Sequence, residues 1–184
     1  MIKINNKETS GGFTLVETLV AIGVLVLAVT GAFSAAQMGI TTSTYSKNQV
    51  IAFYLAQDGV EFIRNIRDNN GLNGQFWLTG ISSNSSDPCY FGNTCIIDPT
   101  AVSPSPNMVR CSGGSGSCPL LKQDSTSGIY GYVSGTDTIF RREIQLTRIN
   151  DNEISILVSV IWRKGLVDRT FRVRENIFDW QTST

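Results

Sequence analysis

The sequence predicts an α+β protein in which a long N-terminal helix packs on a C-terminal antiparallel sheet. Three observations lead to this prediction. Residues 13–33 form an apolar stretch with a single charged residue. The residues that follow repeat their apolar side chains at three- and four-residue steps, which is the period of a helix. Residues 136–184 alternate apolar and polar side chains, which is the period of a strand.

Composition limits the chemistry that the chain can perform. The 184 residues carry no net charge, so no polyanionic partner is indicated, and no nucleic-acid or small-molecule ligand is expected. Histidine is absent, which removes Ser-His-Asp and Cys-His nucleophile pairs and imidazole-ligated metals. The carboxylates are scattered and form no cluster that suggests catalysis. We therefore expect neither an enzyme nor a cofactor.

Four segments are predicted along the chain. Residues 1–12 are a short polar leader, and residues 13–70 form the long helix, of which 13–33 cross a membrane. Residues 71–135 form a loop region tied by disulfides, and residues 136–184 form the sheet.

The apolar stretch is the first element of the helix. Its 21 residues are enough to cross a bilayer, which needs about 20. Lys3 and Lys7, against Glu8, put a slight excess of positive charge before it. This bias favours a cytoplasmic N-terminus, with everything after the span exported.

Three interpretations of this stretch compete. An ordinary signal peptide would be cleaved after the apolar run, and Ala32-Phe33-Ser34 fits such a site loosely. That leader would be unusually long, and Glu17 would lie inside its apolar part. The chain would then be a membrane-tethered or secreted binding module. An uncleaved anchor explains the hydrophobicity, but it explains neither Gly11-Gly12 nor Glu17.

The third interpretation comes from the run Gly12-Phe13-Thr14-Leu15-Val16-Glu17 and the uncharged residues after it. This run resembles the processing signature of type IV pilins and type II secretion pseudopilins. The resemblance implies that a prepilin peptidase cuts between Gly12 and Phe13, that the new amine on Phe13 is methylated, and that Glu17 guides assembly with other pilin-like subunits. It also implies that the chain lies in the inner membrane, among its lipids, before it joins a filament.

The glycine pair and the glutamate of this run can each be explained by elementary chemistry. A glycine pair keeps the chain extended and uncluttered for a protease cleft. Glu17 is the only acid in an apolar setting, where an unpaired carboxylate costs on the order of 2.5 kcal/mol. It therefore needs a cation, which is either the Phe13 amine of its own helix or that of a neighbouring subunit. The resemblance favours the neighbour.

Beyond the membrane span the helix becomes amphipathic. Its apolar side forms one stripe, and Gln57, Glu61, Arg64 and Asp68 take the opposite side, with Glu61 and Arg64 paired. The stripe consists of Ala52, Leu55, Ala56, Gly59, Phe62, Ile63 and Ile66. Asp68-Asn69-Asn70-Gly71 then supplies a helix stop. At 1.5 Å per residue, the helix from Phe13 to Asp68 would be about 84 Å long.

Residues 71–135 are rich in Ser, Gly, Asn and Pro and contain all four cysteines: Cys89, Cys95, Cys111 and Cys118. Behind an export segment, an even count predicts two disulfides. Of three possible connectivities we favour nearest neighbours, because each pair closes a short loop. A zinc site is disfavoured by the gaps between the cysteines and the lack of histidine. Phe76, Trp77, Tyr90 and Phe91 are expected to dock this region on the core, although an aromatic binding site is a possible alternative.

The remaining residues predict an antiparallel meander. Its apolar face comprises Ile144, Leu146, Ile154, Ile156, Val158, Val160, Trp162, Val167, Phe171, Val173 and Ile177. The charged face carries Arg141, Arg163, Arg172 and Arg174. A sheet with one apolar face needs one apolar partner, and the helix stripe is the natural one. The resemblance implies the same architecture, and the run YLAQDGVEFIR and the Phe178-Asp179-Trp180 ending resemble minor pilins and pseudopilins more than major pilins.

Overall fold

The computed structural model describes residues 11–100 and 107–180. The chain consists of two compact units, Met1–Lys47 and Asn48–Thr184. Helix α1 (Leu15–Leu72) supplies the described helix of unit 1 and continues into unit 2. Of the predicted leader, residues 1–10 lie outside the described part of the chain, and only Gly11 and Gly12 are described.

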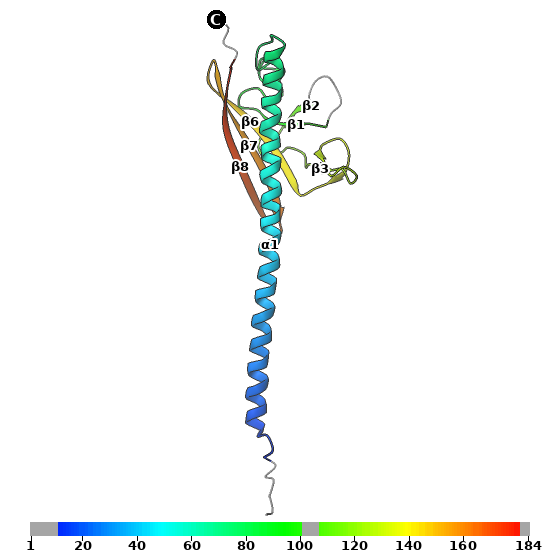
Figure 1. The fold of residues 1–184 in the computed structure, drawn as a ribbon, viewed down its shortest axis with the longest axis vertical. Coiled ribbons are helices and arrows are strands. Elements are labelled where there is room, and N and C mark those ends of the chain that lie inside the picture. Colours follow the sequence, from blue (N-terminus) through cyan, green and yellow to red (C-terminus); the bar gives the residue numbers. More distant parts are fainter. Residues whose placement is uncertain (1–10, 101–106, 181–184) are drawn as a thin grey trace, which may run out of the picture. The chain divides into compact units, whose positions relative to one another are not determined.

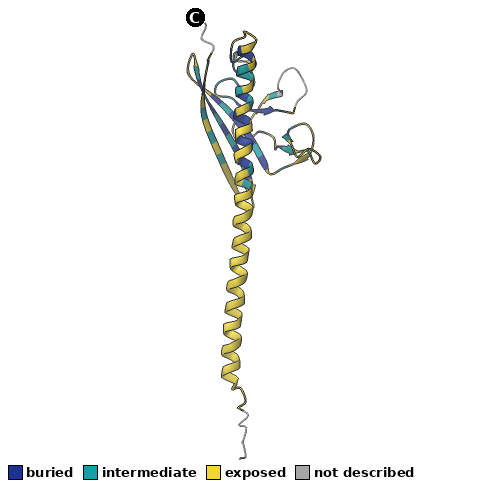
Figure 2. Ribbon diagram, viewed as in Figure 1, coloured by how far each residue is buried: buried dark blue, intermediate teal, exposed yellow. Residues whose placement is uncertain are grey.

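Unit 1 contributes the part of α1 that the sequence assigns to the membrane. Every described residue of this unit is exposed, as the unbroken yellow of its helix in Figure 2 shows. The helix is long enough and apolar enough to cross a membrane, and it lies near the N-terminus. Because water does not tolerate such a surface, this segment needs lipid or other protein around it.

Unit 2 is built around a five-stranded antiparallel sheet in the order β2-β1-β6-β7-β8 (Figure 1). The three long strands are β6 (Phe140–Asn150), β7 (Glu153–Lys164) and β8 (Val167–Phe178). They form the expected meander, and β8 is an edge strand. In β7 the even-numbered residues Ile154–Trp162 are buried and the odd-numbered residues between them are half-buried, so the predicted alternation is confirmed.

The helix stripe packs on the apolar face of this sheet, which confirms the predicted α+β class. Its buried members are Ala52, Leu55, Ala56, Gly59 and Ile63, with Val60 in addition. Phe62 and Ile66 are partly buried against the same core. Helix and sheet approach closely at Gly59, because a Cβ there would lie 3.2 Å from Cγ1 of Val158. Figure 2 shows the dark buried bands of α1 only where it lies over the strands.

The region 71–135 contains more regular structure than the sequence suggested. Strands β1 (Thr94–Asp98) and β2 (Asn107–Arg110) extend the main sheet beyond β6. Strands β3 (Lys122–Gln123) and β4 (Tyr130–Gly131) join β5 (Thr136–Asp137) in a small second sheet. All five residues of β1 are buried, so this strand has no polar face and shows no alternation in the sequence.

Two details of the sequence prediction are wrong. Val167 is half exposed and not part of the core, because it adjoins the turn where β8 begins. Phe76 is also largely exposed and does not dock the loop region, whereas its neighbour Trp77 is buried in the core. Phe91 packs against the core as expected, and Tyr90 is half-buried.

Candidate processing and assembly site

The start of α1 is set by Thr14. Residues 11–14 are not helical, and the helix begins at Leu15. The backbone N–H of Glu17 donates to Oγ1 of Thr14 at 3.2 Å, and the N–H of Thr18 donates to the Thr14 carbonyl at 3.2 Å. Thr14 is therefore the N-cap, and Thr14-Leu15-Val16-Glu17 has the sequence of a capping box. Only Thr14 separates Phe13 from the first helical residue, Leu15, so the Gly12-Phe13 bond lies in non-helical chain.

The glycine pair before Phe13 is not explained by the packing of this chain. A Cβ at Gly11 or Gly12 would meet nothing within 4 Å, and neither residue has the positive φ that favours glycine. Phe13 is itself exposed. A short exposed segment with small residues and no helical hydrogen bonds is the form of backbone that a protease can bind. The need for glycine here is consistent with an external partner.

Glu17 lies in the first turn of α1, where the N–H groups and the helix dipole favour negative charge. Between Gly11 and Ser46 it is the only charged residue, and Lys47 is the next. No cation from the described residues forms an ion pair with it. Glu17 is thus a lone acid on an exposed apolar helix, close to the proposed new N-terminus.

Several threonine hydroxyls on this helix are satisfied within it. The hydroxyl of Thr30 donates to the carbonyls of Val26 and Leu27 at 2.8 and 3.1 Å, and that of Thr18 donates to Leu15 at 2.9 Å. Such bonds hide a hydroxyl from an apolar environment. The carboxylate of Glu17 cannot donate to a carbonyl of its own helix in this way, because an ionised carboxylate only accepts hydrogen bonds and carries a full charge.

Small residues form two adjacent stripes on the same helix. Each stripe has the four-residue step that lets helices approach closely, and the stripes are Ala28, Ala32 and Ala36, and Gly31, Ala35 and Gly39. A Cβ added at Gly31 or Gly39 would meet nothing within 4 Å. Their small size is not used inside this chain.

Comparison of the chain with protein-family models, with curated proteins and with solved structures found no match.

The attachment of α1 to the sheet includes a charged residue that the sequence prediction missed. Arg142 of β6 is 1% exposed, and its guanidinium donates to the carbonyls of Leu55 (3.2 Å) and Ile97 (2.9 Å) and pairs with Asp58. Asp58 is 48% exposed at its side chain. Alternation backwards from Ile144 would have placed Arg142 on the apolar face, but arginine is rarely expected there.

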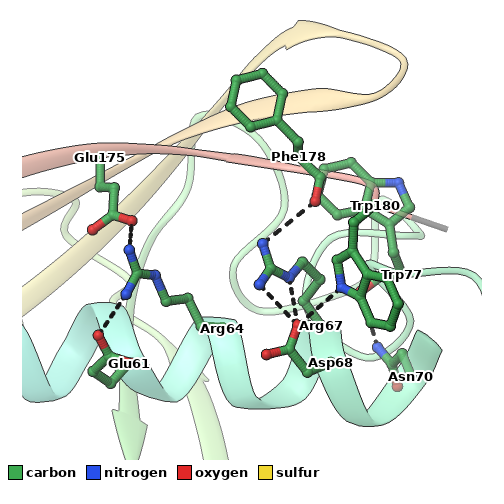
Figure 3. Close-up of polar contacts among 9 residues, drawn as sticks. All are labelled: Glu61, Arg64, Arg67, Asp68, Asn70, Trp77, Glu175, Phe178 and Trp180. Atoms are coloured by element: carbon green, nitrogen blue, oxygen red, sulfur yellow. Dashed lines mark hydrogen bonds and ion pairs between the residues drawn. The ribbon is translucent and has the colours of Figure 1, made fainter. Parts of the chain in front are cut away.

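A second polar network ties the far end of the helix to β8 and the residues after it (Figure 3). Arg64 bridges Glu61 (2.7 Å) and Glu175, which confirms the predicted helical pair. Arg67 binds Asp68 at 2.8 Å, and Nε1 of Trp180 donates to the same carboxylate at 3.1 Å. These contacts form two clusters, one around Arg64 and one around Asp68, and both hold β8 and the residues after it on the helix.

Both disulfides pair nearest neighbours, as favoured from the sequence. Cys89 joins Cys95 with Cα atoms 5.2 Å apart, and Cys111 joins Cys118 at 5.0 Å. The second loop is also held on β6 by the buried Glu143, which accepts from Oγ of Ser115 (2.9 Å) and N of Gly116 (2.7 Å). Two disulfides fit a domain that folds in an oxidising compartment.

The described residues contain no group of three or more His, Cys, Asp and Glu side chains that could hold a metal. A largely apolar cavity of about 660 Å³ lies beside α1, lined by Ile51, Tyr54, Leu55 and Asp58 of the helix and by Pro99, Thr100, Ile129 and Tyr130. Its one carboxylate, Asp58, is already paired with Arg142.

Proposed function

We propose that this chain is the precursor of a pilin-like structural subunit, a minor pilin or a pseudopilin, of a type IV pilus or a type II secretion pseudopilus. A prepilin peptidase removes residues 1–12, and residues 13–33 hold the subunit in the inner membrane until assembly. The exported part, carried by α1, then becomes part of a filament at the cell surface or in the periplasm.

The observation that carries this proposal is the start of α1. An uncovered apolar helix begins two residues beyond a glycine pair, and it carries one acid in its first turn. The glycines at 11 and 12 and the small residues at 31 and 39 serve no packing purpose within this chain. Both features are explained if a peptidase binds the chain at Gly11 and Gly12 and if neighbouring helices pack against Gly31 and Gly39.

Filament growth would require the helix to leave the bilayer. Its apolar surface must then be buried by neighbouring helices, because water would not tolerate it. Glu17 would pair with the Phe13 amine of a neighbour, which sets the axial offset between subunits. This pairing neutralises both charges in the same step that buries them.

The mature N-terminus tests the processing step. The chain is expressed with and without a prepilin peptidase, and the N-terminal peptide is identified by mass spectrometry. We expect a methylated Phe13 only with the peptidase. A chain that begins at Ala35, or that keeps Met1 in a cell with active peptidase, would instead indicate a tethered or secreted binding module.

Two glycine substitutions, one at Gly12 and one at Gly31, test whether the peptidase recognises Gly12. Gly12→Val introduces a branched side chain at the proposed cleavage position, where nothing in the chain would clash with it, and we expect the precursor to accumulate. Gly31→Ala, which also meets open space, is the matched control and should be processed normally. Equal processing of both variants would contradict recognition at Gly12.

A further inference from the structure

Strand β8 is an open edge of the main sheet, and Figure 1 shows it as the outermost strand on its side. Its 12 residues pair with β7 in one continuous register, and the strand contains neither proline nor glycine. Alternate residues of β8 direct their backbone N–H and C=O groups away from β7, and no strand among the described residues pairs with them. Charged side chains are the one protective device that this long edge carries.

The side of β8 that faces α1 is incompletely buried. Val158 and Val160 of β7 are fully buried. Their pairing partners on β8, Val173 and Phe171, are only half-buried. Phe171 contacts Phe53 of α1, with ring centres 5.9 Å apart, and Phe53 is itself 40% exposed. The apolar face of the sheet therefore continues to the open edge, where a further strand would bury more of it.

The opposite side of β8 carries Arg172 and Arg174, which belong to the charged face predicted from the sequence. Both are exposed, and within the described part of the chain neither has a hydrogen bond or an ion pair. The other two arginines of that face are engaged. Arg141 donates to a backbone carbonyl of the second disulfide loop at 2.6 Å, and Arg163 pairs with Asp168 at 2.7 Å.

The strand next to β8 offers no acid to these two arginines. On β7, Ser159 lies opposite Arg172 and Leu157 lies opposite Arg174. Glu143 of β6 lies one strand further, opposite Ser159, but it is buried and both of its oxygens accept hydrogen bonds from the second disulfide loop. Opposite charges on directly paired residues stabilise neighbouring strands. The position that could supply such charges lies on the open side of β8.

We propose that the open edge of β8 is a docking site for an acidic, extended segment of a partner protein, which adds to the sheet as a further strand. Acidic side chains of this segment would lie beside Arg172 and Arg174, and the apolar side chains between them would lie beside Phe171 and Val173. Backbone hydrogen bonds would supply affinity, and the alternation of acidic and apolar residues would supply specificity. The proposal goes beyond the proposed function, because it requires neither cleavage nor a filament.

The probe for this site is a fluorescein-labelled synthetic peptide in which glutamate and valine alternate. Fluorescence anisotropy measures its binding to the full-length chain in detergent micelles, and amide hydrogen exchange shows which backbone groups become protected. Two control peptides carry lysine in place of every glutamate, or proline in place of the two central valines. We expect only the acidic peptide to bind and to protect the amides of β8, because proline cannot donate to a ladder and lysine would face arginine.

Two double variants of the chain test the charge pairing. Arg172→Gln with Arg174→Gln should weaken binding of the acidic peptide roughly ninefold, about threefold for each cross-strand pair that is lost. Arg110→Gln with Lys122→Gln is the matched control, because it removes the same charge from strands β2 and β3. The control should leave the affinity unchanged. An equal loss for both double variants would indicate long-range attraction alone and would overturn the proposal.

Other outcomes would also overturn the acidic partner. One is failure of the acidic peptide to bind, and another is equally tight binding of the proline peptide, which would exclude strand pairing. If the amides of β8 become protected as the protein concentration rises without peptide, the edge pairs with a second copy of this chain instead. The experiment uses neither a peptidase nor other subunits, so its failure would leave the proposed function untouched.

Discussion

The ion pair between the buried Arg142 and the half-exposed Asp58 provides a sharp test of how the sheet is attached to α1. Removing one partner of a buried ion pair typically costs about 3–5 kcal/mol, because the other charge is left without compensation. In Asp58→Asn the guanidinium stays buried and keeps its bonds to the carbonyls of Leu55 and Ile97. Because Asp58 is 48% exposed and partly screened by water, we expect a loss of about 2 kcal/mol.

Arg142→Met should cost less than its burial suggests. The substitution removes the charge, fills much of the same volume and eliminates Nε, which is buried without a hydrogen-bond partner. The substitution also removes the hydrogen bond from Arg142 to the Ile97 carbonyl. This loss costs roughly 1–3 kcal/mol if no water molecule takes the place of the guanidinium donor. The carboxylate left behind, that of Asp58, is 48% exposed and stays hydrated, so we expect a net loss of about 1 kcal/mol.

The measurement is urea unfolding of the full-length chain in detergent micelles, followed by tryptophan fluorescence. Trp77 and Trp162 are buried in unit 2, and unit 1 has no tryptophan, so the signal reports on this domain. Arg172→Met, on the exposed face of the sheet, is the control and should change the free energy of unfolding by less than about 0.5 kcal/mol.

The double variant decides the question. Once Arg142 is replaced, Asp58→Asn no longer leaves a buried charge without its partner. The free energy of unfolding of the double variant should therefore match that of Arg142→Met within about 0.5 kcal/mol. Strictly additive losses would show that the two side chains do not act as a pair. A loss for Arg142→Met well above that for Asp58→Asn would refute the argument that desolvation opposes the arginine.

Four further changes test other parts of the molecule. Glu17→Gln should leave cleavage intact but reduce incorporation into filaments, because the neutral amide cannot balance an ammonium; normal filaments would refute the pairing. Thr14→Ala should lose about 1 kcal/mol of helix-start stability, seen as faster amide exchange in the first turn, while Thr14→Ser should keep it. Replacing both Cys111 and Cys118 by Ser should cost about 2.5 kcal/mol in urea unfolding from the short loop alone; no change would show that Glu143 suffices to hold the loop. Burial raises the pKa of Tyr132, so the unfolded chain loses this proton first as pH rises through about 10, and stability falls there; Tyr132→Phe should flatten that fall, and an unchanged pH profile would contradict it.

Much of the fold could be predicted from local patterns. The helix stripe from Ala52 to Ile63 and the buried positions of β7 follow periods of 3.6 and 2 because one side of each element faces water. The pairing of the four cysteines could also be predicted from the sequence, because closing a short loop costs little entropy. The proposed processing signature is also local, because the residues that carry it, Gly12 to Glu17, are consecutive.

The features that the sequence left undecided depend on neighbours from distant parts of the chain. Strand β1 lacks alternation because the Cys111–Cys118 loop covers the side of Ile96 while the core covers Ile97. Thr14 could have been found from its three-residue spacing to Glu17, and only the structure shows that it caps the helix.

The sequence alone determined that this protein has one apolar helix with a lone acid near its start and a sheet with one apolar face, because hydrophobic periodicity and charge are properties of neighbouring residues. Only the tertiary structure decided that Arg142 is buried against the helix and that β1 completes the sheet. These arrangements follow from contacts between residues tens of positions apart, and no local period encodes such contacts.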